Sequence, residues 1–172
     1  MLKIAGVILC ISGATGYGIL KITGWNQAVL ELEQWILLFE RMKNHICYRR
    51  DIITEICCRM GEEMYGIGGR YVASVGRELK NDRTKSFTHV WQGIMSEWTG
   101  QSYLSRQVKK IICDFPKYMG EQDPEQQINH LNFYIQRLVT EKEKLEKEIS
   151  NKKKPVMAIS LVSGITVSVL LI

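Results

Sequence analysis

The pattern of apolar and charged positions divides the chain into two charge-free ends and a mixed middle segment. Residues 4–20 (IAGVILCISGATGYGIL) carry no charge and lie between Lys3 and Lys21. Residues 155–172 (PVMAISLVSGITVSVLLI) are also uncharged and follow a run of lysines. As a helix each stretch spans roughly 26 Å, and flanking lysines can snorkel to cover the rest of a ~30 Å hydrocarbon core. We therefore expect one transmembrane helix over 4–20 and another over 155–172.

Between these ends, the apolar residues of 21–154 recur at steps of three and four, which is typical of amphipathic helices. No segment alternates convincingly as a strand. Trp91 and Trp98 share one helical face and are expected in the core, whereas the glycine-rich stretch 66–69 is expected to be a turn. The fold class is therefore all-α, with a cytoplasmic bundle of about six helices between the two spans. The expected helices cover residues 26–48, 52–64, 70–80, 85–98, 102–115 and 124 onward.

Capping residues mark several of these helix starts. Asp51 can cap the second helix and Ser102 the fifth. The last helix has the most specific start, because Asp123 can accept from the first amides, Pro124 suits the first helical position and Gln126 can complete a capping box. From there the helical pattern continues up to the second charge-free segment.

Basic residues near the expected spans predict their orientation. Lys21 and the basic residues between 137 and 154 lie on the side of the middle segment, whereas only Lys3 lies on the other side. We therefore expect residues 21–154 to form a cytoplasmic domain. The cysteines lack the spacing of a metal site and fit that reducing compartment as small buried residues.

The first charge-free segment has a second interpretation as a signal peptide, with its nearest cleavage region at residues 14–16. The chain would then be a signal-processed, C-terminally anchored extracellular helical domain that acts as an adhesin or sensor. A third possibility is a membrane enzyme whose site is completed by another chain. The N-terminal sequence of the mature protein would separate the two-span from the signal-peptide interpretation, because a retained Met1 would support two spans.

Both charge-free segments have small residues four positions apart, a spacing that lets helix backbones approach closely in lipid. We expect these faces to pair with each other or with a partner's helix. The candidate packing residues are Ser12, Gly16 and Gly18 in the first segment and Ser160, Gly164 and Ser168 in the second.

Composition and motifs argue against nucleic-acid binding and against catalysis. The 23 basic and 18 acidic residues, with a net charge of +5, are too evenly balanced for a nucleic-acid binder. Residues 66–69 lack the Lys-Ser/Thr pair of a phosphate-binding loop. His45, His89 and His130 lie far apart in the sequence, and no positioned base can be named for Cys57. We therefore expect no enzymatic activity, metal, cofactor or small-molecule substrate.

Residues 119–127 (MGEQDPEQQ) carry the most specific motif of the chain. They resemble the Leu-Gly-x-x-Asp-x-x-x-Gln pattern of the stage III sporulation protein AB family, and Gly120, Asp123 and Gln127 match it while Met119 replaces leucine. The resemblance extends over nearly the whole chain, from the first apolar segment to the last. The presence of Asp123 and Gln126 in this stretch is also explained by helix capping. The motif therefore marks a helix start and need not form a contact site.

A second stretch matches the family less completely. Tyr48 and Glu55 fit a Tyr-Gly-x-Thr-Pro-Leu-x-Glu-like segment, but the stretch Arg49-Arg50-Asp51-Ile52 departs from it. This departure leaves open any function that depends on that turn.

The resemblance implies that residues 21–154 are similar to the cytoplasmic domain of inner-membrane platform proteins of type II secretion and type IV pilus systems. It implies a non-enzymatic scaffold of the channel-like complex between mother cell and forespore, in the mother-cell membrane facing the forespore. Expected partners are a secretion-type ATPase, the membrane and ring-forming proteins of that complex, and membrane lipid. The candidate docking residues are Arg49, Arg50, Glu55, Lys152, Lys153 and Lys154.

Overall fold

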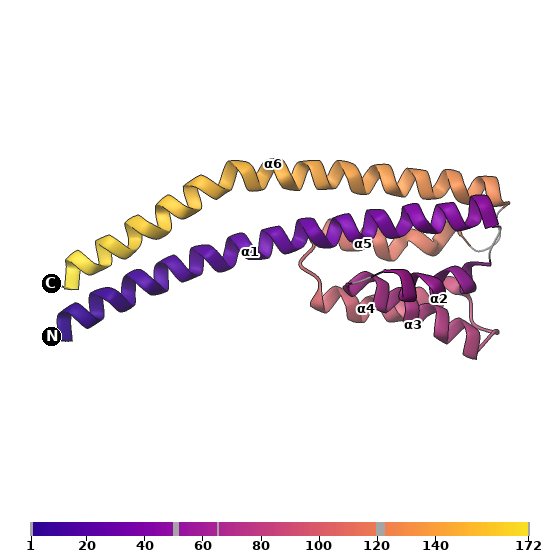
Figure 1. The fold of residues 1–172 in the computed structure, drawn as a ribbon, viewed down its shortest axis with the longest axis horizontal. Helices are drawn as coiled ribbons and strands as arrows, with labels where there is room; N and C mark the ends of the chain where they lie inside the picture. The colour runs from indigo at the N-terminus through magenta and orange to yellow at the C-terminus, as the bar shows by residue number, and fades with distance from the viewer. Residues whose placement is uncertain (1, 50–51, 65, 120–122, 172) are drawn as a thin grey trace. The chain divides into compact units, whose positions relative to one another are not determined.

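A computed structural model describes the backbone of residues 2–49, 52–64, 66–119 and 123–171. Its description excludes the side chains of residues 2–12, 14–15, 17–18, 49, 118, 154, 157, 159–161 and 163–171. The described residues form helices and no strand, which confirms the all-α class (Figure 1). The elements are α1 (Leu2–Asn44), a π-helical turn (His45–Arg49), α2 (Ile53–Glu63), α3 (Ile67–Asn81), α4 (Phe87–Gln101), α5 (Arg106–Asp114), a 3₁₀ turn (Phe115–Tyr118) and α6 (Pro124–Leu171).

The chain divides into two compact units. The bundle unit comprises Leu30–Lys142, and the terminal unit combines Met1–Val29 with Glu143–Ile172. The two longest helices, α1 and α6, each contribute to both units. α1 runs without interruption through the expected boundary at residue 20, and α6 continues through Pro155 despite the backbone hydrogen bond that a proline removes. The expected domain limits at 20/21 and 154/155 therefore stay predictions from sequence.

In the bundle unit, α1 and α6 run antiparallel in a defined register. Lys142 Nζ lies 2.6 Å from Glu33 Oε1. Further along, Lys43 Nζ donates to Asn132 Oδ1 at 3.1 Å. The end of α1 and the start of α6 therefore lie at one end of the bundle unit (Figure 1). The pair of residues 33 and 142 lies further along the two helices, toward the other end of the unit.

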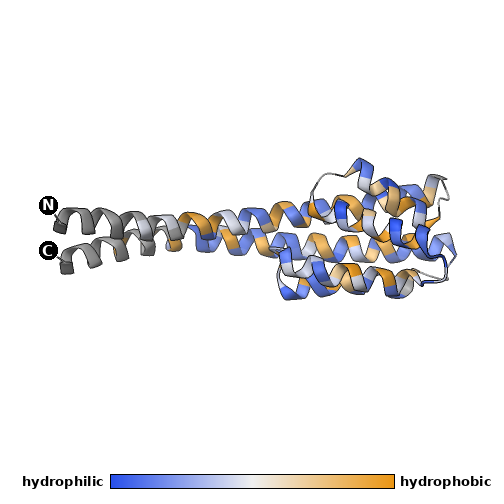
Figure 2. Ribbon diagram, turned by 90° about the horizontal axis from the view of Figure 1, so that it is seen from below, coloured by the Kyte–Doolittle hydropathy of each residue, from blue (hydrophilic) through white to orange (hydrophobic). Residues whose placement is uncertain are grey.

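An aromatic cluster forms the core of the bundle unit. Trp35 on α1 packs edge-on against Trp98 on α4, with ring centroids 4.9 Å apart. Phe39 meets Phe115 at 4.5 Å, and Trp91 meets Phe115 at 5.3 Å. All five side chains are fully buried, which confirms the core position of Trp91 and Trp98. Figure 2 shows the apolar residues interleaved with polar ones along the helices of this unit, as expected for amphipathic elements.

The expectation of a turn over residues 66–69 is wrong for its last three positions. Gly66 is the N-cap of α3 with a φ of 108°, but Gly68 and Gly69 lie inside the helix. A Cβ on Gly68 would lie 3.2 Å from the Trp35 ring, and one on Gly69 would lie 2.5 Å from the Met64 carbonyl oxygen. The missing side chains let α3 approach its neighbours closely, and this packing outweighs the low helix propensity of glycine.

Helix starts also differ from the sequence expectations. Ile52 is the N-cap of α2 and makes no side-chain cap hydrogen bond, while Asp51 lies outside the described residues. Ser105, not Ser102, caps α5 by accepting from the Val108 amide at 3.3 Å. Ser102 instead ends α4, because its own amide still donates to a carbonyl of that helix. The prediction of a cap at Ser102 was therefore wrong by three residues.

Among the described residues, no helix has a stretch that is both long and apolar enough to cross a membrane. The spans expected over 4–20 and 155–172 stay predictions, since most of their side chains lie outside the description.

Candidate functional site

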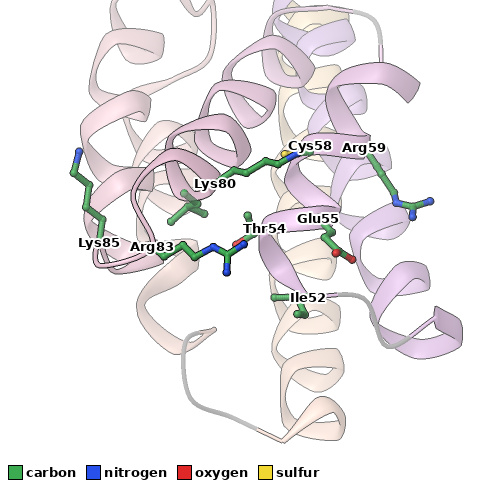
Figure 3. Close-up of a pocket in the computed structure, with 9 residues that line it drawn as sticks. Ile52, Thr54, Glu55, Cys58, Arg59, Lys80, Arg83 and Lys85 are labelled. Atoms are coloured by element: carbon green, nitrogen blue, oxygen red, sulfur yellow. The ribbon is translucent and has the colours of Figure 1, made fainter.

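A groove of about 560 Å³ opens on the bundle unit where α2 begins and α3 ends (Figure 3). We call it the α2–α3 groove. Ile52 and Leu79 supply apolar surface, and Glu55 is the single carboxylate among the described residues that line it. Its basic residues are Arg59 on α2, Lys80 on α3, and Arg83 and Lys85 in the turn after α3.

Small residues determine how closely the two walls of the groove approach each other. A Cβ on Gly76 of α3 would lie 2.5 Å from the backbone nitrogen of Cys58 on α2. A Cβ on Gly61 would likewise overlap the Cβ of Ala73. The two backbones therefore touch along these positions, because glycine adds no side chain between them. The groove opens beyond this contact, where larger side chains line the walls.

Hydrogen bonds within the turn hold its basic residues in place. The Asp82 carboxylate accepts from the Thr84 amide at 3.1 Å and from the Thr84 hydroxyl at 2.6 Å. These bonds lower the pKa of Asp82. Such a side-chain-to-backbone bond two residues on is the Asx turn that aspartate favours. Arg83 lies between the two bonded residues, so its backbone is fixed at the edge of the groove.

The groove has an excess of positive charge. Lys85 Nζ lies 2.5 Å from Glu78 Oε1, a hydrogen bond that raises the pKa of Lys85. Arg59, Lys80 and Arg83 are exposed and make no ion pair within the part of the chain that the structure describes. Lys80 and Arg83 extend from their own wall toward α2, whereas Arg59 and Lys85 point away from the groove centre (Figure 3).

The candidate docking residues do not all belong to one unit. Glu55 lines the α2–α3 groove of the bundle unit. Lys152 and Lys153 are exposed in the terminal unit, where Lys152 Nζ lies 3.1 Å from Glu148. The side chains of Arg49 and Lys154, and the whole of Arg50, lie outside the described residues. A surface that joins all six residues stays a prediction.

The sequence pattern did not single out Arg59, Lys80 and Arg83 as site residues. Each is an ordinary exposed position on its own element, and nothing in the local pattern distinguishes it from other solvated basic residues. The pairing of α2 with α3 brings the three together. Glu55 was the single signal that pointed toward this region.

The family motif lies at the start of α6. Pro124 is the first residue of the helix, as expected, and the Gln127 amide donates to the Asp123 carbonyl at 3.1 Å. The side chain of Gln127 donates to the Met119 carbonyl at 3.4 Å, which ties the two ends of the motif together. Gly120 lies outside the described residues, Gln126 is exposed, and its role in a capping box stays a prediction.

The expected packing positions in the charge-free ends lie mostly outside the description. A Cβ on Gly16 would meet no described atom within 4 Å. The remaining positions are Ser12, Gly18, Ser160, Gly164 and Ser168, whose side-chain surroundings lie outside the described residues.

The cysteines differ in their environments. Burial raises the pKa of the Cys57 thiol, in agreement with its expected role as a small core residue. Cys47 is exposed, so that expectation was wrong for this residue, and Cys58 and Cys113 are partly exposed. In the described part of the chain, no three His, Cys, Asp or Glu side chains come together as a metal site would require.

The described residues thus form an all-helical bundle with a basic groove on its surface. The family model for stage III sporulation protein AB matches residues 3–172. The chain therefore belongs to the stage III sporulation protein AB family, as its motif indicated, and this membership supports a role in sporulation.

A solved structure described as "Stage III sporulation protein AB (SpoIIIAB)" has the same fold, with a TM-score of 0.65. The two chains are 11% identical, and the match covers 72% of this chain and 97% of that one. At this identity the likeness concerns the fold alone. No curated protein sequence matches the chain significantly.

Proposed function

We propose that this chain is a non-enzymatic scaffold of the channel-like secretion complex that joins mother cell and forespore. Its charge-free segments 4–20 and 155–172 span the mother-cell membrane that faces the forespore. Residues 21–154 lie in the cytoplasm, where they dock a secretion-type ATPase. The membrane and ring-forming proteins of the complex are its other partners. Membership of the family supports the sporulation role, and the finer assignments rest on the features below.

The observation that carries the proposal is the grouping of the two chain ends. Within the bundle unit, α1 and α6 run antiparallel, with Lys142 paired to Glu33 and Lys43 bonded to Asn132. Both charge-free segments belong to the terminal unit. Two uncharged segments of 17 and 18 residues that belong to one compact unit and are bordered by lysines suit a helical hairpin anchored in one membrane.

A scaffold role agrees with the chemistry of the bundle unit. Its groove presents guanidinium and ammonium groups around apolar side chains, a combination that recognises another protein. A platform must also hold its shape under load. The interlocked aromatic rings of α1 and α4, with centroids 4.9 Å apart at Trp35 and Trp98, provide a rigid core.

Cysteine labelling tests the membrane topology directly, and Cys47 is suitable because it is exposed. A full-length variant would keep Cys47 and carry alanine at the other cysteines, which are Cys10, Cys57, Cys58 and Cys113. Sealed membrane vesicles of both orientations would be treated with a membrane-impermeant maleimide. We expect labelling in inverted vesicles, whose cytoplasmic face is accessible, and protection in right-side-out vesicles.

Two results would contradict the anchored cytoplasmic domain. Labelling of Cys47 in right-side-out vesicles would place the domain on the opposite side of the membrane. Release of the chain from vesicles by alkaline carbonate would show that neither segment spans the bilayer. The intact mass of the purified protein addresses the extracellular alternative, because loss of the first segment would favour a signal-processed adhesin or sensor.

A further inference from the structure

The α2–α3 groove combines two features that are separately unremarkable on a protein surface. Two apolar side chains line the groove and form what we call its floor. Ile52 is 67% exposed, whereas Leu79 is almost buried at 6%, so the open part of this apolar surface is mainly Ile52. The exposed basic groups of Lys80 and Arg83 extend toward this floor, whereas Arg59 lines the groove but points away from its centre (Figure 3). Exposed apolar surface bordered mainly by positive charge, with Glu55 as an acidic exception, is typical of a binding site.

The charges of the groove indicate the sign of its ligand. Lys85 has its partner in Glu78, but the other three cations have no acidic partner among the described residues. In the part of the lining that the structure describes, Glu55 is the one carboxylate against four basic residues, so the charge of that part is net positive. A partner with acidic groups along its edges would find complementary charge at Lys80 and Arg83, which both extend toward the groove (Figure 3).

The apolar floor narrows the class of ligand further. A small anion would neutralise the cations but would leave Ile52 in contact with water. An amphipathic helix instead places apolar side chains at steps of three and four on the floor and carboxylates at the rim. A volume of about 560 Å³ holds a few side chains of this kind.

We propose that the α2–α3 groove binds an acidic amphipathic helical segment of a partner protein. Apolar residues of that segment cover Ile52 and Leu79, and its carboxylates pair with Lys80 and Arg83. Glu55 repels a fully acidic segment from one side of the groove and so favours one direction of binding. This inference rests on the proposed docking function, because it assigns a surface and a chemistry to that function.

A charge reversal with a matched control tests the surface. The variant Lys80→Glu/Arg83→Glu changes the groove by four charge units, and Arg106→Glu/Lys110→Glu makes the same change at exposed positions on α5. Binding of the full-length chain in detergent to purified sporulation ATPase would be titrated at low and high salt. We expect the groove variant to weaken binding by on the order of ten- to a hundred-fold and to reduce its salt dependence. The control should stay within about two-fold, as expected for charges outside an interface.

The outcomes of this titration separate the two proposals. Equal binding by the groove variant and the unmodified chain would refute the groove inference and leave ATPase docking intact. Absence of binding by the unmodified chain would refute ATPase docking, and the partner of the groove would then be decided by cross-linking. Circular dichroism of both variants checks that the helices are retained.

Cross-linking from the floor of the groove tests the chemistry of the ligand. A photoreactive phenylalanine analogue would replace Ile52 in the full chain in sporulating cells, and the cross-linked segment would be sequenced by mass spectrometry. We expect a protein segment rich in Asp and Glu, with apolar residues at steps of three and four. Exchanging its acids for lysine should restore binding to Lys80→Glu/Arg83→Glu. Cross-links to lipid, to a basic segment or to nothing would overturn the proposal.

Discussion

Replacement of Glu31 by alanine perturbs the polar contact that joins α1 to the end of α4. The Glu31 side chain is buried inside the bundle unit, with 6% exposure. Its Oε1 atom accepts from the Trp98 indole N–H at 3.0 Å, and its Oε2 atom accepts from the Tyr103 amide at 2.9 Å. The variant Glu31→Ala therefore leaves two donors without their acceptor.

The magnitude follows from the surroundings of each donor. Trp98 is fully buried, so its indole N–H loses its partner where water has little access. A buried donor left in this way costs about 1–3 kcal/mol. The Tyr103 side chain is 61% exposed, and the nearby amide can recover part of its loss by bonding to water. We expect Glu31→Ala to lower the free energy of unfolding by about 2–4 kcal/mol, and Glu31→Gln, which keeps one acceptor oxygen, by about half of that.

Glu33 provides a matched control on the same helix. Its side chain is 46% exposed and lies 2.6 Å from Lys142 Nζ, so Glu33→Ala should cost no more than about 1 kcal/mol. Urea unfolding of the full-length chain in mild detergent, followed by tryptophan fluorescence, measures all three variants. If Glu31→Ala and Glu33→Ala lower the free energy of unfolding equally, the argument from the buried hydrogen bonds is wrong.

Two further predictions concern the glycines and the thiols. Gly76→Ala places a Cβ 2.5 Å from the Cys58 backbone nitrogen and should lower the free energy of unfolding by about 1–3 kcal/mol. Gly93→Ala, where a Cβ meets no described atom within 4 Å, should raise it by about 0.5–1 kcal/mol; the same urea titration compares them. A maleimide should modify Cys47 much faster than Cys57, whose burial raises its pKa; equal rates by mass spectrometry would contradict this.

Local pattern was sufficient for the class of fold and for several helix positions. The spacing of apolar residues predicted helices because a residue's place on a helical face depends only on its near neighbours in sequence. It placed Trp91 and Trp98 correctly in the core. Pro124 marked the first residue of α6, since its fixed φ and missing N–H suit that position. The motif at 119–127 indicated the family that the whole-chain match confirmed.

Contacts between residues far apart in the sequence decided the features that the local pattern did not predict. Gly68 and Gly69 belong to α3 because that helix packs on Trp35 and Met64, which the local propensity of glycine does not encode. The burial of Glu31 depends on Trp98, a residue 67 positions away.

The α2–α3 groove also depends partly on local sequence and partly on tertiary contacts. The sequence by itself determined that α2 and α3 are amphipathic helices with exposed basic residues. Only the tertiary structure brought Arg59 to the same groove as Lys80 and Arg83, because the glycine-mediated contact of the two helices fixes which exposed faces become neighbours.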